Sequence, residues 1–206
     1  GKQVWTLPLV SGGKQYYYKD AYLHIPFQTK VLEYVPECSY KPLIPMLVLE
    51  NGNVYMPHVY TTRITPKIEE DCMILICEYD GLCHMANESP EKVENTKAIV
   101  TYIFEKNQIR REDKWFLNTN DICIKEAKLI FLTYSDAPQI HDNKITFDSG
   151  IVKSMQVNGL EICEVNKVLD NDNYNTSHGR LKHEIIWKCK DIDPLYALNF
   201  DWTITY

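Results

Sequence analysis

The chain has 206 residues, of which 45% are hydrophobic and 24% are charged, a composition that supports a folded core and argues against a disordered chain. Its formal net charge of -6 argues against a nucleic-acid partner, because phosphate binding requires clustered lysine and arginine. The apolar runs are far shorter than the roughly 20 residues of a membrane-spanning helix, so we expect no membrane partner. We expect a single β-rich domain over residues 1–206, with two packed β subdomains as the alternative.

The first third of the chain predicts short, irregular strands. Prolines are frequent there, and proline removes a donor from the hydrogen-bond ladder, so these strands are expected at sheet edges or bulges. A turn at Ser11-Gly12-Gly13 and a hairpin turn at Asn51-Gly52 punctuate them. The candidates are Gln3–Leu9, Tyr22–Phe27, Val31–Val35, Leu43–Leu49 and Val54–Thr62.

The middle of the chain continues the pattern and adds two weak helix signals. Ser89–Thr96 begins with a capping serine and a proline, which favours one or two helical turns, and Asn107–Lys114 is a second candidate. Asp80-Gly81, Ser149-Gly150 and Asn158-Gly159 are further turn signals, and Asn158-Gly159 suits a two-residue hairpin. The strand candidates are Met73–Tyr79, Ala98–Phe104, Ile122–Tyr134, Lys144–Phe147, Ile151–Val157 and Leu160–Val168.

The last residues give the clearest pattern. In Leu198–Tyr206 apolar residues alternate with polar ones at a period of two, as in a strand with one buried face, and Leu181–Cys189 alternates in a similar way. Many short strands with regular turn signals predict an all-β fold. We expect an antiparallel β-sandwich with one or two short helical turns.

The segment Asp71–His84 holds three of the seven cysteines and one histidine. Structural zinc sites pair their ligands two to four residues apart, and no such pair exists here, so we expect no metal. A reactive thiol needs a setting that stabilises the thiolate, whereas carboxylates precede or follow these cysteines.

Disulfides are therefore the preferred reading, with reduced core cysteines as the alternative. Cys72 and Cys77 lie about 16 Å apart on a regular strand and cannot bond each other, so the bonds are expected to reach distant segments. The count is odd, which leaves at least one thiol free or paired between chains. The candidates are Cys38, Cys72, Cys77, Cys83, Cys123, Cys163 and Cys189.

A disulfide framework places the protein in an oxidising compartment, and we expect it to be secreted. No signal peptide is visible, so a secreted form would be the mature chain. Asn175 and Asn87 begin N-glycosylation sequons, and Asn175 lies in a hydrophilic loop that suits a glycan.

Catalytic and cofactor motifs are incomplete. His183-Glu184 begins like the zinc-protease motif but lacks the second histidine and lies on a predicted strand. The loop from Asp170 begins like a calcium loop but has no glycine at the sixth position and Leu181 at the twelfth. We therefore expect no cofactor and no catalytic residues, and a binding protein rather than an enzyme.

Tyrosines and acidic residues supply the candidate binding surface. Tyrosine gives a large contact area at low entropic cost, and acidic loops attract a basic partner. These candidates lie in three segments. They are Tyr16, Tyr17, Tyr18 and Tyr22, then Glu69, Glu70 and Asp71, then Asp170, Asp172 and Tyr174.

The leading hypothesis is a secreted, disulfide-bonded binding protein that engages a basic protein ligand. A chemokine or cytokine that is sequestered, as by an immunomodulatory decoy, would fit the charge and the class. A β-barrel carrier of a small apolar ligand is one alternative, and a hydrolase with a dispersed active site is another.

Overall fold

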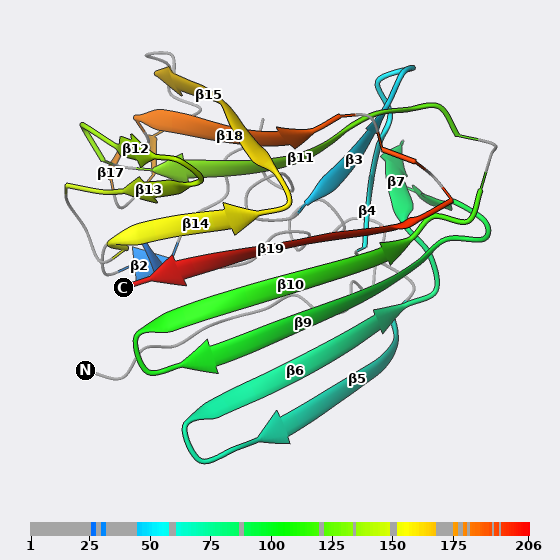
Figure 1. The fold of residues 1–206 in the computed structure, drawn as a ribbon, viewed down its shortest axis with the longest axis horizontal. Coiled ribbons are helices and arrows are strands. Elements are labelled where there is room, and N and C mark those ends of the chain that lie inside the picture. The colour runs from blue at the N-terminus through cyan, green and yellow to red at the C-terminus, as the bar shows by residue number, and fades with distance from the viewer. Residues whose placement is uncertain are drawn as a thin grey trace.

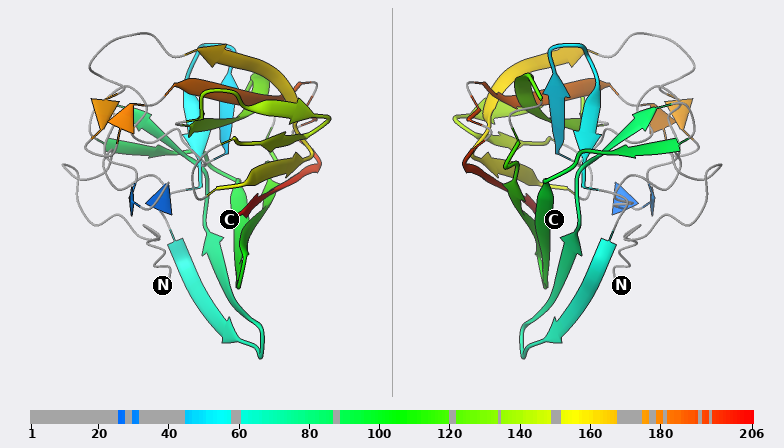
Figure 2. Two further views of the ribbon diagram at one scale, coloured as in Figure 1. Left: turned by 90° about the vertical axis from the view of Figure 1, so that its left-hand side faces the viewer. Right: turned by 90° about the vertical axis from the view of Figure 1, so that its right-hand side faces the viewer.

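The computed structural model confirms the antiparallel β-sandwich (Figures 1 and 2). Its described part contains no helix that is long and apolar enough to cross a membrane. The structure describes residues 26–27, 30–31, 45–57, 61–86, 89–119, 122–133, 135–148, 152–167, 175–176, 179–180, 182–190, 192–193 and 195–206.

The larger sheet has eight strands, all paired antiparallel with their neighbours. It contains two of the segments in which the sequence shows period-two alternation, Ala98–Phe104 and Leu198–Tyr206. In spatial order the strands are β12 (Gln139–His141), β13 (Lys144–Thr146), β14 (Ser154–Asn158), β19 (Ala197–Thr205), β10 (Gln108–Phe116), β9 (Lys97–Glu105), β6 (Cys72–Tyr79) and β5 (Thr61–Ile68).

The second sheet has seven strands and packs across the first. In spatial order its strands are β15 (Glu161–Lys167), β18 (His183–Cys189), β11 (Ile124–Thr133), β3 (Met46–Leu49), β4 (Val54–Met56), β7 (Cys83–Ala86) and β8 (Ser89–Lys92). Two further pairs form small sheets: β1 (Pro26–Phe27) with β2 (Lys30–Val31), and β16 (Asn175–Thr176) with β17 (Gly179–Arg180).

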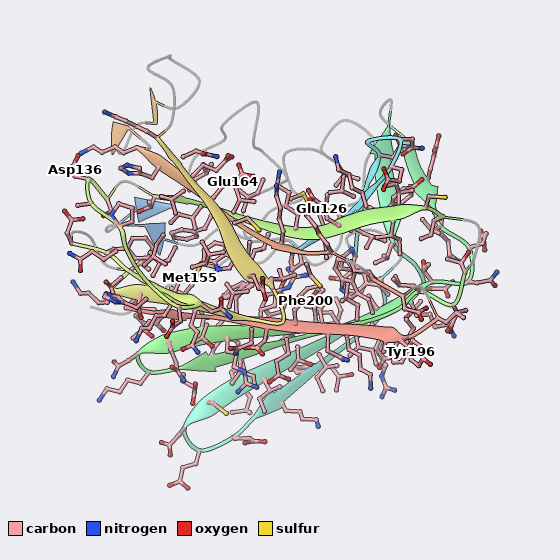
Figure 3. The ribbon with its side chains drawn as sticks, turned by 45° about the horizontal axis from the view of Figure 1, so that its top comes forward. Glu126, Asp136, Met155, Glu164, Tyr196 and Phe200 are labelled. Carbon is pink, nitrogen blue, oxygen red and sulfur yellow. The ribbon has the colours of Figure 1, made fainter. Side chains whose placement is uncertain are left out.

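The core lies between the inner faces of the two sheets. Phe200, Trp202 and Ile204 alternate with half-buried or exposed polar residues along β19, as the period-two pattern predicts. Trp187 on β18 is fully buried in the same cluster, and Trp115 meets Phe200 edge to face at 4.9 Å. The side chains of Met155 and Phe200 belong to this layer (Figure 3).

One of three glycine turns closes a hairpin. Asn51-Gly52 closes the hairpin between β3 and β4, with Gly52 at a φ of 85° and its N–H donating to Leu49 at 2.9 Å. Asp80-Gly81 and Asn158-Gly159 instead carry the chain from one sheet to the other. Both dipeptides are therefore turns, as predicted, but the hairpin expected at Asn158-Gly159 is wrong because β14 and β15 lie in different sheets.

The two predicted helical segments are strands. Residues 89–92 form β8 and pair with β7, and residues 108–116 form β10 in the middle of the large sheet. Strand pairing outweighs the capping signal at Ser89, because each ladder bond satisfies groups that a single helical turn leaves free.

The hairpin of β5 and β6 extends beyond the rest of the sandwich, at the lower edge of Figure 1 and at the bottom of both views in Figure 2. β6 pairs with β9 over its whole length, whereas β5 pairs only with β6 and ends the described sheet. The inner face of this hairpin therefore continues the core face of the sheet beyond the area that the second sheet covers.

Candidate protein-binding site

Three of the expected binding residues, which are consecutive in the sequence, lie in the part of the chain that the structure describes. Glu69, Glu70 and Asp71 are exposed and form the turn of the β5–β6 hairpin, here named the acidic turn. The other expected binding residues lie outside the described residues, namely Tyr16, Tyr17, Tyr18, Tyr22, Asp170, Asp172 and Tyr174. Asn87 also lies outside them, and Asn175 is described only as part of the backbone of β16.

The acidic turn is held by backbone and side-chain bonds. The Glu69 N–H donates to the Cys72 carbonyl at 2.9 Å, directly beyond the paired residues Ile68 and Met73. The Cys72 thiol donates to the Glu69 carboxylate at 3.7 Å. The three carboxylates are thus presented to solvent on an ordered turn.

The acidic turn lowers the reactivity of the thiol beside it. Partial burial first, and then the carboxylates of Glu69, Glu105 and Asp71, raise the pKa of Cys72 above its ordinary value. The thiol therefore stays protonated at neutral pH and is a poor nucleophile. The carboxylates near Cys72 therefore disfavour its thiolate, as the sequence predicts.

Apolar side chains lie beside the acidic turn, and the sequence analysis missed them. Ile68 is 87% exposed and Met73 is 42% exposed, and the two face each other across the hairpin. Their face is the inner one, because Cys77 and Leu75 of the same face pack in or against the core. The sequence does contain one signal for this apolar pair. Ile68 and Met73 lie at the two ends of the charged turn, and alternation along each strand places them on the same face.

The expected disulfides are not formed among the described cysteines. No disulfide joins any two of the six described cysteines, and Cys38 lies outside the described residues. Cys77 points into the core, where burial raises its pKa to about 11. The buried Cys83 thiol donates to the Met56 carbonyl at 3.5 Å. Both behave as small core residues, the alternative that the sequence left open.

Thiol labelling tests this arrangement. We expect an alkylating reagent at neutral pH to modify Cys123 and Cys163 in the native protein, because both are exposed. Cys77 and Cys83 should react only after unfolding, because burial removes access to both thiols and also raises the pKa of Cys77. Peptide mapping by mass spectrometry gives the readout. Native modification of Cys77 at the rate of Cys123 would contradict the buried position of β6.

Ionisable groups also meet beside β15 and β18. A cavity of about 580 Å³ there is lined in part by Cys163, Lys188 and Cys189. Lys188 lies 2.8 Å from Glu164 and 3.9 Å from Glu126, two residues that Figure 3 labels. The hydrogen bond between Lys188 and Glu164 lowers the carboxyl pKa and raises the ammonium pKa. This pairing keeps both groups charged and gives Lys188 no role as a base.

The described residues offer no recognisable metal centre. Among them no three side chains of His, Cys, Asp or Glu lie close enough together to hold an ion. His183 Nδ1 lies 2.9 Å from the Ser135 carbonyl, so the histidine of the incomplete zinc-protease motif makes a backbone contact on a strand. This segment is therefore the strand that its alternation predicts.

Comparison with known proteins gives only weak structural similarity. No family model matches the sequence, and no curated protein matches it. Among solved structures, a heparinase III is similar at 12% identity with a TM-score of 0.46, over 77% of this chain and 23% of that one. The heparan sulfate lyase HepC from Pedobacter heparinus is similar at 11% identity with a TM-score of 0.42, over the same shares. The chain thus spans about a quarter of each structure, and a likeness this weak carries no argument about activity.

Proposed function

We propose that the protein is a binding protein and that the β5–β6 hairpin engages a basic protein ligand. One observation carries the proposal: Ile68, 87% exposed, lies directly beside the acidic turn. An exposed isoleucine at the end of a projecting hairpin loses hydration on contact with a partner, which stabilises the complex. The carboxylates around it select a partner of positive charge.

The two kinds of side chain have separate tasks in this proposal. Glu69, Glu70 and Asp71 raise the association rate of a basic ligand through long-range attraction, which salt screens. Ile68 and Met73 form the apolar centre from which the ligand excludes water, and so they slow dissociation. A binding surface of this type needs no catalytic group.

The nature of the ligand is a further part of the proposal. A small basic protein of the extracellular space, such as a chemokine or cytokine, has the required charge, and its sequestration would make this protein an immunomodulatory decoy. Secretion and a glycan at Asn175 belong to the same proposal. The binding surface does not depend on disulfides, because hydrogen bonds and strand pairing order the hairpin.

The alternatives have weaker support. A carrier for an apolar ligand needs an empty interior, whereas three tryptophans fill the space between the sheets as fully buried side chains. A hydrolase needs a nucleophile beside a base. Cys163 lies in a cavity next to Lys188, but Lys188 is bound to Glu164.

A mutation of Ile68 tests the binding proposal. A panel of basic chemokines and cytokines is screened against the protein at low and high salt, and the ligand with the strongest salt-sensitive binding is kept. Ile68→Asp is then expected to weaken that binding at least tenfold, roughly the effect of losing one apolar anchor. Surface plasmon resonance should show the change mainly in the dissociation rate.

The matched control is Ile140→Asp, which changes another exposed isoleucine at the opposite edge of the same sheet. It should leave the affinity unchanged. Glu70→Lys should lower the association rate and its dependence on salt. Equal losses from Ile68→Asp and Ile140→Asp would contradict the assignment of the site, and a panel without salt-sensitive binding would contradict the ligand class.

A further inference from the structure

The outer face of the large sheet carries an apolar patch where β6 and β9 pair. Strand register places Ile74 opposite Ile103 and Ile76 opposite Thr101, on the face away from the core. Ile99 lies next along β9 and is 37% exposed, whereas the other three isoleucines are half-buried. An antiparallel sheet usually turns polar side chains to water, so four isoleucines on a solvent face indicate a contact surface.

Opposite charges flank this apolar patch along the strand direction. At one end lie the carboxylates of the acidic turn and of Glu105, the strand partner of Cys72. These four carboxylates outnumber the two exposed cations on the same face, Lys67 beside Ile74 and Arg110 beside Ile103. At the other end lie Arg63, Lys97 and Lys114, all exposed. Glu78 lies between Arg63 and Ile99 in the register and reduces the net charge of this end without reversing it.

We propose that this face binds a second copy of the chain in a twofold-symmetric, face-to-face dimer. A twofold interface requires a patch that is complementary to itself. A twofold axis that crosses the strands in the plane of the interface reverses the strand direction of the partner. The acidic end of each copy then faces the basic end of the other, with Arg63 near the partner's Glu69. The two apolar patches meet in the middle, an arrangement of apolar core and charged rim that is common in interfaces.

The free edge of the same sheet is a poor alternative contact. Pro66 on β5 has no N–H to donate to an added strand, and proline in a sheet is found at edges of this kind. Arg63 and Lys67 add positive charge to the same edge. Proline and lysine are two features that protect edge strands from pairing with other chains. The chain therefore favours contact through the sheet face rather than through the edge.

The inference does not rest on the proposed function, although the acidic turn takes part in both. The dimer uses the outer face, whereas the ligand proposal uses Ile68 and Met73 on the inner face. A basic ligand and the second copy would compete for the carboxylates of the turn. Ile76 belongs only to the dimer surface and Ile68 only to the ligand site, so variants of these two residues let the two proposals succeed or fail separately.

A charge exchange tests the dimer. Sedimentation equilibrium at low salt over a range of concentrations should show a monomer–dimer equilibrium that high salt shifts to the monomer. Arg63→Glu and Glu69→Arg should each weaken the dimer about tenfold, because each places like charges opposite each other twice. A mixture of the two variants should form a heterodimer of the original strength, since every facing pair is then opposite in charge. The double variant should recover the homodimer.

Two further variants complete the design. Ile76→Asp should abolish the dimer, and Thr203→Asp, on the outer face of β19, should leave it unchanged. Thermal melts of every variant show whether the monomer still folds. A chain that stays monomeric at low salt and high concentration would overturn the proposal. The proposal would also be overturned if the chain dimerises but a mixture of Arg63→Glu and Glu69→Arg does not regain the original dimer strength. A dimer formed through the β5 edge would give that result.

Discussion

Asp113→Asn is expected to lower the free energy of unfolding by about 3–5 kcal/mol, because it leaves a buried arginine without its counter-ion. Arg111 and Asp113 lie on the inner face of β10, with side chains 2% and 0% exposed. Two hydrogen bonds join them, from Arg111 Nε at 2.6 Å and from Arg111 Nη2 at 2.8 Å. Such bidentate pairs are the strongest ion pairs available to arginine.

The neighbouring groups complete this buried network. Arg111 Nη1 donates to the Tyr102 hydroxyl at 2.9 Å, and Trp115 Nε1 donates to Asp113 at 3.0 Å. Burial disfavours the arginine cation, but the Asp113 carboxylate outweighs this and raises the pKa of Arg111 above its ordinary value. Burial also raises the pKa of Tyr102 to about 12. Arg111 therefore stays charged and the Tyr102 hydroxyl stays protonated at neutral pH.

The same strand supplies a matched control. Arg110 and Glu112 form an ion pair with the same spacing on the outer face, where their side chains are 44% and 40% exposed. Glu112→Gln should cost less than about 1 kcal/mol, because water and salt screen an exposed pair. Urea unfolding of both variants gives the comparison. Similar losses from the two variants would contradict the view that burial gives the inner pair its importance.

These two ion pairs explain why the sequence predicts a helix where the structure has strand β10. Arg110, Arg111, Glu112 and Asp113 are consecutive charged residues, so the segment shows no apolar alternation and its sequence favours a weak helix. The structure pairs it with β9 and β19 over its whole length and buries every second charge. A strand whose inward charges neutralise each other carries no period-two signal, and only the neighbouring strands reveal it.

Alternation succeeded where the inward residues are apolar. The patterns in β19 and β9 give both the strands and their buried faces. The acidic turn was also found, since three consecutive carboxylates are visible in the sequence. Ile68 and Met73 were not, because their exposure depends on how far the second sheet reaches over the first. The packing of segments that are distant in the sequence decides how much of the first sheet is covered, and a local sequence pattern holds no information about that packing.

Gly159→Ala is expected to lower the free energy of unfolding by about 2–5 kcal/mol, from backbone strain and steric overlap together. Gly159 has a φ of 80°, a conformation that residues with a Cβ rarely adopt. A Cβ at this position would lie 2.6 Å from the Asn199 carbonyl oxygen and 3.1 Å from Phe200 Cβ. The oxygen belongs to the backbone, so a rotamer change cannot relieve the contact.

Gly52 separates the two causes. It has nearly the same φ, 85°, but an added Cβ there would meet nothing within 4 Å. Gly52→Ala should therefore show the strain alone, about 1–2 kcal/mol. Urea unfolding of both variants gives the free energy of unfolding that each one loses. The additional loss in Gly159→Ala measures the steric contact with strand β19 of the turn that connects β14 to β15. Equal losses would mean that this turn can move away from β19, and hence that this junction of the two sheets is looser than its packing indicates.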